Sequence, residues 1–304
     1  MLLRRAGLPV SAGTRLRDLA ELVRAPAALS VPGDVLSGAA AAGALRGARG
    51  PALAASSVCL YWGGMALNDY ADRRLDADER PERPIPSGRV RPGTALAVAA
   101  GLTGAGIALA AAAGGRRALG TAIPLAGAVW AYDLLLKRTP AAPAGMALCR
   151  GLDVMLGAAP ALGGWRDALP AAVTVGAHTY AVTLLSRGEV AGTSARRVGW
   201  ACAANAPVVP LAAAQIRAAR RSGPSRAVAA GLLCAYAGAV SRPQAEAVRE
   251  PSADRVRRAV GAGILGLIPL QAALTAARGH PAAALALVPA HPLARRLARK
   301  VSPT

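Results

Sequence analysis

An acidic run between residues 67 and 79 carries the side chains best suited to chemistry. Asn68, Asp72 and Asp76 follow one another at intervals of four residues, which places them along one face of an α-helix. Like charges at this spacing repel each other by about 0.2–0.5 kcal/mol per pair in water, and more strongly beside a low-dielectric wall. Mg²⁺ accepts carboxylate and amide oxygens together with water and substrate phosphates. The spacing therefore predicts a magnesium site that holds a phosphorylated substrate.

The loop after this run adds cations. Residues 80–89 read Arg-Pro-Glu-Arg-Pro-Ile-Pro-Ser-Gly-Arg, and the three prolines stiffen the chain. We expect this loop to fold its cations, Arg83 among them, back over a diphosphate. The simpler alternative is a solvated helix end whose acids pair with Arg73, Arg74, Arg80 and Arg83. We favour the first interpretation because the run directly follows an apolar segment and its spacing is regular.

The elements that position these residues are predicted to be membrane helices. Of the 304 residues, 54% are hydrophobic and 17% are charged, well below the roughly 25% charged residues of soluble domains. The apolar residues form blocks of about 20 residues, the length that crosses a bilayer as a helix. The blocks lie at about 25–45, 52–68, 93–114, 118–136, 141–162, 168–186, 198–216, 227–241 and 259–277, with a weaker one at 281–293. We predict an all-α integral membrane bundle of about nine transmembrane helices, with a lead-in at 1–24 and one domain at 25–304.

Composition and charge exclude several classes of protein. The apolar content excludes intrinsic disorder, and four cysteines are too few for a disulfide scaffold. The net charge is +20, which could suit nucleic acid. The arginines, however, lie between apolar blocks instead of forming one patch, and aromatic residues, on which bases could stack, make up only 3%. We therefore expect no nucleic-acid partner. Basic residues favour the cytoplasmic side of a membrane. Their distribution predicts a protein of the cell membrane whose N-terminus and active-site loops are cytoplasmic.

The acidic run and the loop together resemble a known motif. The pattern N-D-x-x-D-x-x-x-D at 68–76, followed by R-P-I-P-S-G at 83–88, is similar to the first aspartate-rich motif of the UbiA superfamily of membrane prenyltransferases. The number of apolar blocks also fits that family's nine-helix bundle. The resemblance implies Mg²⁺-dependent transfer of an isoprenoid chain from a prenyl diphosphate to a small aromatic or lipophilic acceptor within the lipid bilayer. It also implies that Asn68, Asp72 and Asp76 hold Mg²⁺ against the diphosphate.

Cations elsewhere in the chain are expected to complete the diphosphate site. Tyr132, Lys137 and Arg138 close the fourth apolar block, in a connection that resembles the family's Tyr/Lys pair. Arg150 lies inside the fifth block, where an ionisable residue is a functional candidate by default. The residues expected to bind diphosphate are Arg24, Arg83, Tyr132, Lys137, Arg138, Arg150 and Arg187. The residues expected to be catalytic are Asp72, Asp76 and Lys137.

The family's second acidic motif is only partly present. It would follow the sixth block, where Glu189 matches but Ser186 and Thr193 stand in place of acids and Arg187 lies between them. We therefore expect Glu189 to be the one carboxylate ligand that this motif supplies to a metal. The segment 178–189 also resembles an EboC-like branch of the family, which is associated with export of prenylated or aromatic metabolites. The alternative function is a non-catalytic membrane protein that binds or helps to export such a metabolite.

Several other ionisable residues lie inside or beside apolar blocks. Asp34 and Asp153 fall within blocks, and each would either line the cavity between helices or pair with an arginine. His178, His280 and His291 are isolated in the sequence. Because none has a second ligand at helical spacing, we do not expect a zinc site.

Overall fold

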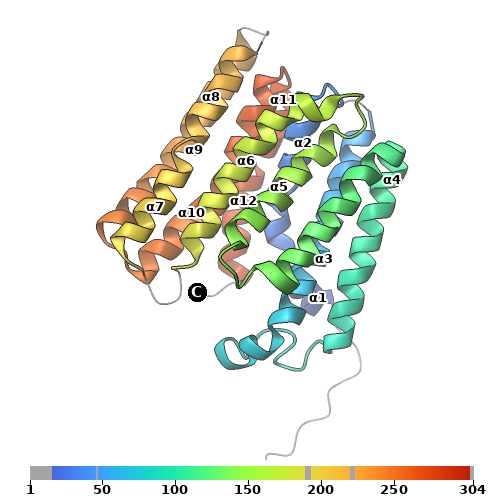
Figure 1. Ribbon diagram of the computed structural model, residues 1–304, viewed down its shortest axis with the longest axis vertical. Coiled ribbons are helices and arrows are strands. Elements are labelled where there is room, and N and C mark those ends of the chain that lie inside the picture. The colour runs from blue at the N-terminus through green and yellow to red at the C-terminus, as the bar shows by residue number, and fades with distance from the viewer. Residues whose placement is uncertain (1–15, 46, 189–192, 220–222, 302–304) are drawn as a thin grey trace, which may run out of the picture.

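The chain folds into a bundle of helices (Figure 1). The computed structural model describes residues 16–45, 47–188, 193–219 and 223–301, and the regular structure within these ranges is helical. The elements are α1 (Leu16–Leu22), the 3₁₀-helix η1 (Ala25–Ser30), α2 (Pro32–Ala41), α3 (Arg49–Glu79), α4 (Pro92–Ala131), the π-helical turn η2 (Tyr132–Leu136), α5 (Ala142–Ala158), α6 (Gly164–Ser186), α7 (Ala195–Asn205), α8 (Val208–Ala218), α9 (Pro224–Arg249), α10 (Ala253–Ala277), α11 (Pro281–Leu287) and α12 (Ala290–Val301). The prediction of an all-α fold is confirmed.

Two of the predicted apolar blocks, 93–114 and 118–136, correspond to α4 and the turn η2 that follows it. The chain reverses its direction within α4. Gly115 lies between the two arms of α4 and has φ 59° and ψ −147°, a conformation that residues with a side chain rarely adopt. Trp130 Nε1 donates a hydrogen bond to Thr103 Oγ1 at 3.1 Å, so the two arms run side by side in opposite directions (Figure 1). The second arm therefore ends beside the last turns of α3.

Glycines allow α2 to lie directly against α5. A Cβ atom at Gly38 would lie 1.8 Å from the carbonyl oxygen of Val154, and one at Gly157 would lie 2.0 Å from that of Val35. Backbones this close leave no room for a side chain, as at other contacts between membrane helices that use small residues. The buried apolar side chains of α5 and α6 then continue into a core shared with α8, α9 and α10.

Long apolar helices identify a multi-pass membrane protein. Within the described part of the chain, three segments are long and apolar enough to cross a membrane, namely Pro92–Leu136, Gly164–Ser186 and Ala253–Ala277. Large apolar side chains on these segments are exposed, among them Ile123 and Ile264. Exposure of such side chains suits contact with lipid, where the backbone must satisfy its own hydrogen bonds as a helix. The prediction of a polytopic helical membrane bundle is confirmed.

The connection after α6 meets the connections that precede α5 and α10 at one end of the bundle. Arg187 Nη1, after α6, donates to the carbonyl oxygen of Thr139 at 2.8 Å. The backbone N–H of Thr193 donates to the carbonyl oxygen of Pro251 at 3.5 Å. The same end collects the charged residues described below. That this end faces the cytoplasm, and that the chain divides into a lead-in and a main domain, stay predictions.

Candidate active site

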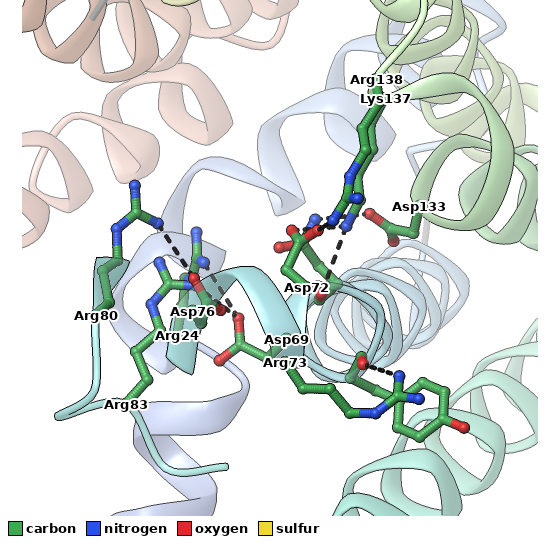
Figure 2. A network of polar contacts seen from close by, with 12 residues as sticks. Arg24, Asp69, Asp72, Arg73, Asp76, Arg80, Arg83, Asp133, Lys137 and Arg138 are labelled. Atoms are coloured by element: carbon green, nitrogen blue, oxygen red, sulfur yellow. Dashed lines mark hydrogen bonds and ion pairs between the residues drawn. The ribbon is translucent and has the colours of Figure 1, made fainter. Parts of the chain in front are cut away.

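The acidic residues at the end of α3 divide into two groups according to the segments that they contact. Asp69 and Asp76, seven residues apart, differ in direction by only about 20°, whereas Asp72 differs from Asp69 by about 60°. Asn68 and Asp72 face η2 and the α4–α5 connection. Asp69 and Asp76 face the N-terminal segment and the loop at 80–91. Figure 2 shows the two groups on different sides of the helix.

The first group, here called the Asp72 cluster, consists of Asn68, Asp72, Asp133, Lys137 and Arg138. Lys137 Nζ lies 2.7 Å from Asp72 Oδ2, and Arg138 Nη2 donates to Asp72 Oδ1 at 2.8 Å. Asn68 Nδ2 donates to Asp133 Oδ1 at 2.9 Å, and Lys137 Nζ also reaches the carbonyl oxygen of Asn68 at 3.4 Å. In Figure 2, Lys137, Arg138 and Asp133 converge on Asp72. Four of the predicted site residues therefore come together.

The two cations determine the charge of Asp72. Partial burial alone would raise the pKa of its carboxyl group. Hydrogen bonds from Lys137 and Arg138, together with their positive charges, outweigh burial and lower the pKa below the ordinary aspartate value. Asp72 is therefore ionised at neutral pH. The cluster holds a carboxylate and two cations at one place, where a divalent ion could bind the former and a diphosphate the latter.

The second group, here called the Asp76 cluster, consists of Asp69, Asp76, Arg24, Arg80 and Arg83. Arg83 Nη1 lies 2.8 Å from Asp76 Oδ2 and 3.3 Å from Asp69 Oδ1. Arg24 Nη2 lies 3.2 Å from Asp69 Oδ1, and Arg80 Nη1 lies 3.8 Å from Asp76 Oδ1. Both carboxylates are buried. The loop therefore folds its cations back onto the acids of α3. Pairing with Arg80 and Arg83 is what the simpler alternative describes, although these acids are buried instead of solvated. That the cations lie over a diphosphate stays a prediction.

A second contact ties the same loop to α1. Arg89 Nη1 donates to Asp18 Oδ1 and to Glu21 Oε2, each at 2.7 Å, and Arg89 Nη2 donates to Glu21 Oε1 at 2.9 Å. The hydrogen bonds to Glu21 raise the pKa of Arg89 above its ordinary value. Ile85 and Val90, which belong to the loop, are buried in a core that includes Leu22 and Leu67. The loop is therefore held in one position over the end of α3.

Arg150 lies deeper in the bundle, apart from both clusters. Its Nη1 lies 3.0 Å from Asp34 Oδ2, and Gln271 Nε2 donates to Asp34 Oδ1 at 2.7 Å. Ser57 Oγ donates to the buried Asp153 at 2.6 Å, and Ser57 precedes the acidic run by about 16 Å of helix axis. Of the two alternatives for Asp34, pairing with an arginine is therefore the one observed. A diphosphate contact for Arg150 stays a prediction.

The remaining predicted residues lie beside the Asp72 cluster or outside the described residues. Tyr132 begins η2 and packs on α5, where a Cβ atom at Gly145 would lie 3.2 Å from its ring. Arg187 reaches the carbonyl oxygen of Thr139, two residues after Lys137 in sequence. Glu189 lies outside the residues that the structure describes, so its role as a metal ligand stays a prediction.

Two acids of the clusters, Asp69 and Asp133, were not among the residues predicted from sequence. Asp133 lies inside the fourth apolar block, so the rule that flags ionisable residues within such blocks identifies it. Asp69 lies in the acidic run itself, but its spacing sets it off the face shared by Asn68 and Asp72. The prolines predict that the loop brings Arg83 back toward α3, but they do not indicate which acid it contacts.

The donor atoms of the Asp72 cluster suit Mg²⁺. This ion binds through one or two carboxylates and fills its shell with water and substrate phosphates. Asn68 and Asp72 bring an amide and a carboxylate together on the same face of α3. Among the residues that the structure describes, no three His, Cys, Asp or Glu side chains are grouped to hold a metal ion. The remaining ligands would therefore be water and phosphate oxygens.

An apolar cavity of about 610 Å³ lies at the other end of the bundle, between the second arm of α4, α5 and the start of α6. Its lining includes Arg117, Thr121, Pro124, Leu152, Met155 and Trp165, and none of the residues of the two clusters. Pro124 precedes Lys137 by thirteen residues on the same arm, which is about 20 Å along a helix axis. The cavity is therefore separate from the charged site.

The fold and the two clusters define a multi-pass membrane protein with a charged site at one end of a helical bundle. The chain belongs to the UbiA prenyltransferase family, whose family profile matches residues 35–241. Enzymes of this family typically use Mg²⁺ and bind a prenyl diphosphate and an acceptor in membranes. The resemblance to the EboC-like branch stays a prediction.

Curated relatives are similar over part of the chain. A digeranylgeranylglyceryl phosphate synthase of Halobacterium salinarum is 36% identical over 166 residues, which are 52% of this chain and 59% of the relative. Another, of Ignicoccus hospitalis, is 39% identical over 127 residues, which are 42% of this chain and 39% of the relative. This chain therefore spans less than two thirds of the length of these relatives.

Solved structures share the fold. The structure of a UbiA homolog from Aeropyrum pernix K1 superimposes with a TM-score of 0.69 at 19% identity, over 81% of this chain and 96% of that one. A structure from work on digeranylgeranylglyceryl phosphate synthase in membranes superimposes with a TM-score of 0.65 at 14% identity, over 86% and 98%. At these identities the likeness establishes the UbiA-like membrane fold.

Proposed function

We propose that the protein transfers a prenyl group from an isoprenyl diphosphate to a lipophilic acceptor within the membrane, with Mg²⁺ as cofactor. The observation that carries the proposal is the Asp72 cluster, in which Asn68 and Asp72 lie beside Lys137 and Arg138. The amide and carboxylate oxygens could bind the metal ion, and the neighbouring cations could bind the diphosphate attached to it. Once bound, Mg²⁺ would stabilise the negative charge that develops on the leaving diphosphate.

The residues of the Asp72 cluster would take separate roles in this reaction. Asn68 and Asp72 would hold the ion, while Lys137 and Arg138 would leave Asp72 and donate hydrogen bonds to the diphosphate. These donors stabilise the diphosphate as the bond between C1 and oxygen breaks and the electron pair leaves with oxygen. A nucleophilic atom of the acceptor then bonds to C1 and releases a proton. Within the bilayer the apolar helices beside the cluster would limit the access of water, which would otherwise capture the allylic cation.

The Asp76 cluster would bind the outer part of the diphosphate. Arg24 and Arg83 already lie together on one side of Asp69, and two arginines suit the oxygens of a terminal phosphate. Asp76 would keep Arg83 in place or bind a further ion. Four further residues stay predictions: the diphosphate contacts Tyr132, Arg150 and Arg187, and the metal ligand Glu189. Alanine variants in the transfer assay described below would measure their effect on activity.

The identity of the acceptor is a more specific part of the proposal. The relatives' name, digeranylgeranylglyceryl phosphate synthase, describes a product with two geranylgeranyl groups on glyceryl phosphate. An acceptor that already carries one such group is therefore the first to test, with geranylgeranyl diphosphate as donor. Hydroxylated aromatic acids are the second class, because the resemblance found in the sequence implies acceptors that are often aromatic.

The test uses the purified 304-residue chain in lipid nanodiscs with Mg²⁺ and radiolabelled geranyl, farnesyl and geranylgeranyl diphosphates. We expect prenylated acceptor and released diphosphate with at least one donor. Asp72→Asn should abolish both products, because the variant loses the charge that holds the ion. Asp78→Asn is the matched control, since Asp78 is exposed on the same helix, and it should retain activity. Turnover by Asp72→Asn equal to that of the wild type would contradict the proposal.

Two observations favour a non-catalytic function. Lys137 and Arg138 already form ion pairs with the Asp72 carboxylate, and the second motif has Ser186 and Thr193 where acids are expected. A protein that binds a prenylated diphosphate or helps to export its metabolite would retain the labelled compound without releasing diphosphate. Saturable binding with no product from any donor and acceptor would therefore favour this alternative.

A further inference from the structure

Asp133 is a buried carboxylate that no part of the motif resemblance uses. It lies on the π-helical turn η2, where the backbone N–H of Lys137 donates to the carbonyl oxygen of Tyr132 at 2.9 Å. Its side chain is 3% exposed and accepts a hydrogen bond from Asn68 Nδ2 at 2.9 Å. Single π-helical turns occur frequently at functional sites. The partner of Asp133 is thus one of the residues expected to bind the metal.

The hydrogen bond determines which end of the Asn68 amide faces the site. A carboxylate only accepts hydrogen bonds, whereas an amide has a donor end and an acceptor end. Turning the Asn68 carbonyl oxygen toward Asp133 would place two acceptors against each other. With its nitrogen held by Asp133, the amide directs its oxygen away from η2. Oxygen is the atom that a hard cation such as Mg²⁺ binds.

The fold makes room for this contact. Gly64 lies one turn before Asn68 on α3, and a Cβ atom there would lie 2.7 Å from Val129 and 3.7 Å from Asp133 Oδ2. The absent side chain lets the end of α4 approach α3 closely. Lys137, four residues after Asp133, faces the same side and reaches Asp72 at 2.7 Å. Figure 2 shows Asp133 and Lys137 approaching Asp72 together.

We propose that Asp133 is a positioning residue of the metal site, whose carboxylate orients the Asn68 amide so that its oxygen faces the ion bound by Asp72. Outer carboxylates that orient metal ligands typically change metal affinity 10- to 100-fold when removed. The inference rests on the proposed function, because it assumes that Asn68 binds the cofactor. The inference adds Asp133, from the fourth apolar block, to a metal site that the sequence analysis predicted only from the acidic run at 67–79.

The experiment measures ion binding directly with Mn²⁺ as the probe. Purified full-length protein is titrated with Mn²⁺ in the presence of inorganic pyrophosphate, and free Mn²⁺ is followed by electron paramagnetic resonance. We expect Asp133→Ala to weaken Mn²⁺ binding by about tenfold. In an Asn68→Ala background the same substitution should have no further effect, because there is no amide left to orient. Equal losses from Asp133→Ala in both backgrounds would overturn the inference.

A rescue variant separates positioning from a purely structural role. In Asn68→Asp the metal ligand is a carboxylate, whose two oxygens need no orientation. Asp133→Ala combined with Asn68→Asp should therefore bind Mn²⁺ within about threefold of the wild type, even if Asp133→Ala alone folds poorly. Failure of this double variant to regain affinity, with a folded protein by thermal unfolding, would overturn the inference. A wild-type protein that binds no Mn²⁺ with pyrophosphate would instead contradict the proposed function itself.

Discussion

Arg83 lies 2.8 Å from the carboxylate of Asp76, so the loop that leaves α3 folds back onto the helix it has just left. The same guanidinium nitrogen lies 3.3 Å from Asp69. One arginine therefore holds two buried carboxylates that the helix presents two turns apart. Because Arg89 fixes the other end of this loop to α1, the loop is anchored on both sides of the site.

Replacing Arg83 with alanine should destabilise the protein and weaken binding of the prenyl diphosphate. Removing one partner of a buried ion pair costs about 3–5 kcal/mol, and the loss should be smaller here because 19% of the Arg83 side chain is exposed. Thermal unfolding in detergent measures the loss. Arg74→Ala is the matched control, since Arg74 is exposed on the same helix. Equal unfolding temperatures for the two variants would contradict this prediction.

The ion pair between Arg150 and Asp34 should be a structural contact within the bundle. Asp34 is 0% exposed, so Arg150→Ala leaves an uncompensated buried charge, which costs about 3–5 kcal/mol. Changing both residues, with Asp34→Asn and Arg150→Gln together, should recover most of the lost stability because no charge remains. Chemical unfolding in mixed micelles compares the three proteins. An unchanged midpoint for Arg150→Ala would show that the pair does not stabilise the fold.

The close contact of α2 with α5 should not tolerate a methyl group. A Cβ atom at Gly157 would lie 2.0 Å from the carbonyl oxygen of Val35, so Gly157→Ala must push the helices apart. Overpacking of this kind costs about 1–3 kcal/mol, occasionally more. Gly101→Ala serves as the control, because no atom lies within 4 Å of a Cβ built there. If both substitutions leave the unfolding temperature unchanged, the helices are not in the contact described.

Stability should fall at low pH in a way that depends on Asp72. Its pKa is lower in the folded protein than the ordinary value of about 4. A depressed pKa adds stability that is complete above the ordinary value and is lost as pH falls through the lower folded value. The wild type should therefore lose stability more steeply than Asp72→Asn below about pH 4. Unfolding curves recorded at a series of acidic pH values measure both slopes, and parallel slopes would refute the assignment.

The sequence alone was sufficient for the fold class, and it predicted which side chains would gather at the end of α3, while their role in binding stays a prediction. Apolar blocks of about 20 residues predict membrane helices because length and hydrophobicity are local properties of the chain. Spacing along α3 likewise placed Asn68 and Asp72 on one helix face, and Lys137 was expected beside them. These predictions needed only helix geometry and a resemblance carried by adjacent residues.

The tertiary structure decided which partner each charge has. Asp76 was expected with Asp72, but the path of the loop pairs it with Arg83, whereas the connection after η2 pairs Asp72 with Lys137 and Arg138. Asp133 joins the site because Gly64 lets two distant segments of the chain approach each other. Helix periodicity is set by neighbouring residues, whereas ion pairs form between segments whose distance in space no local pattern records.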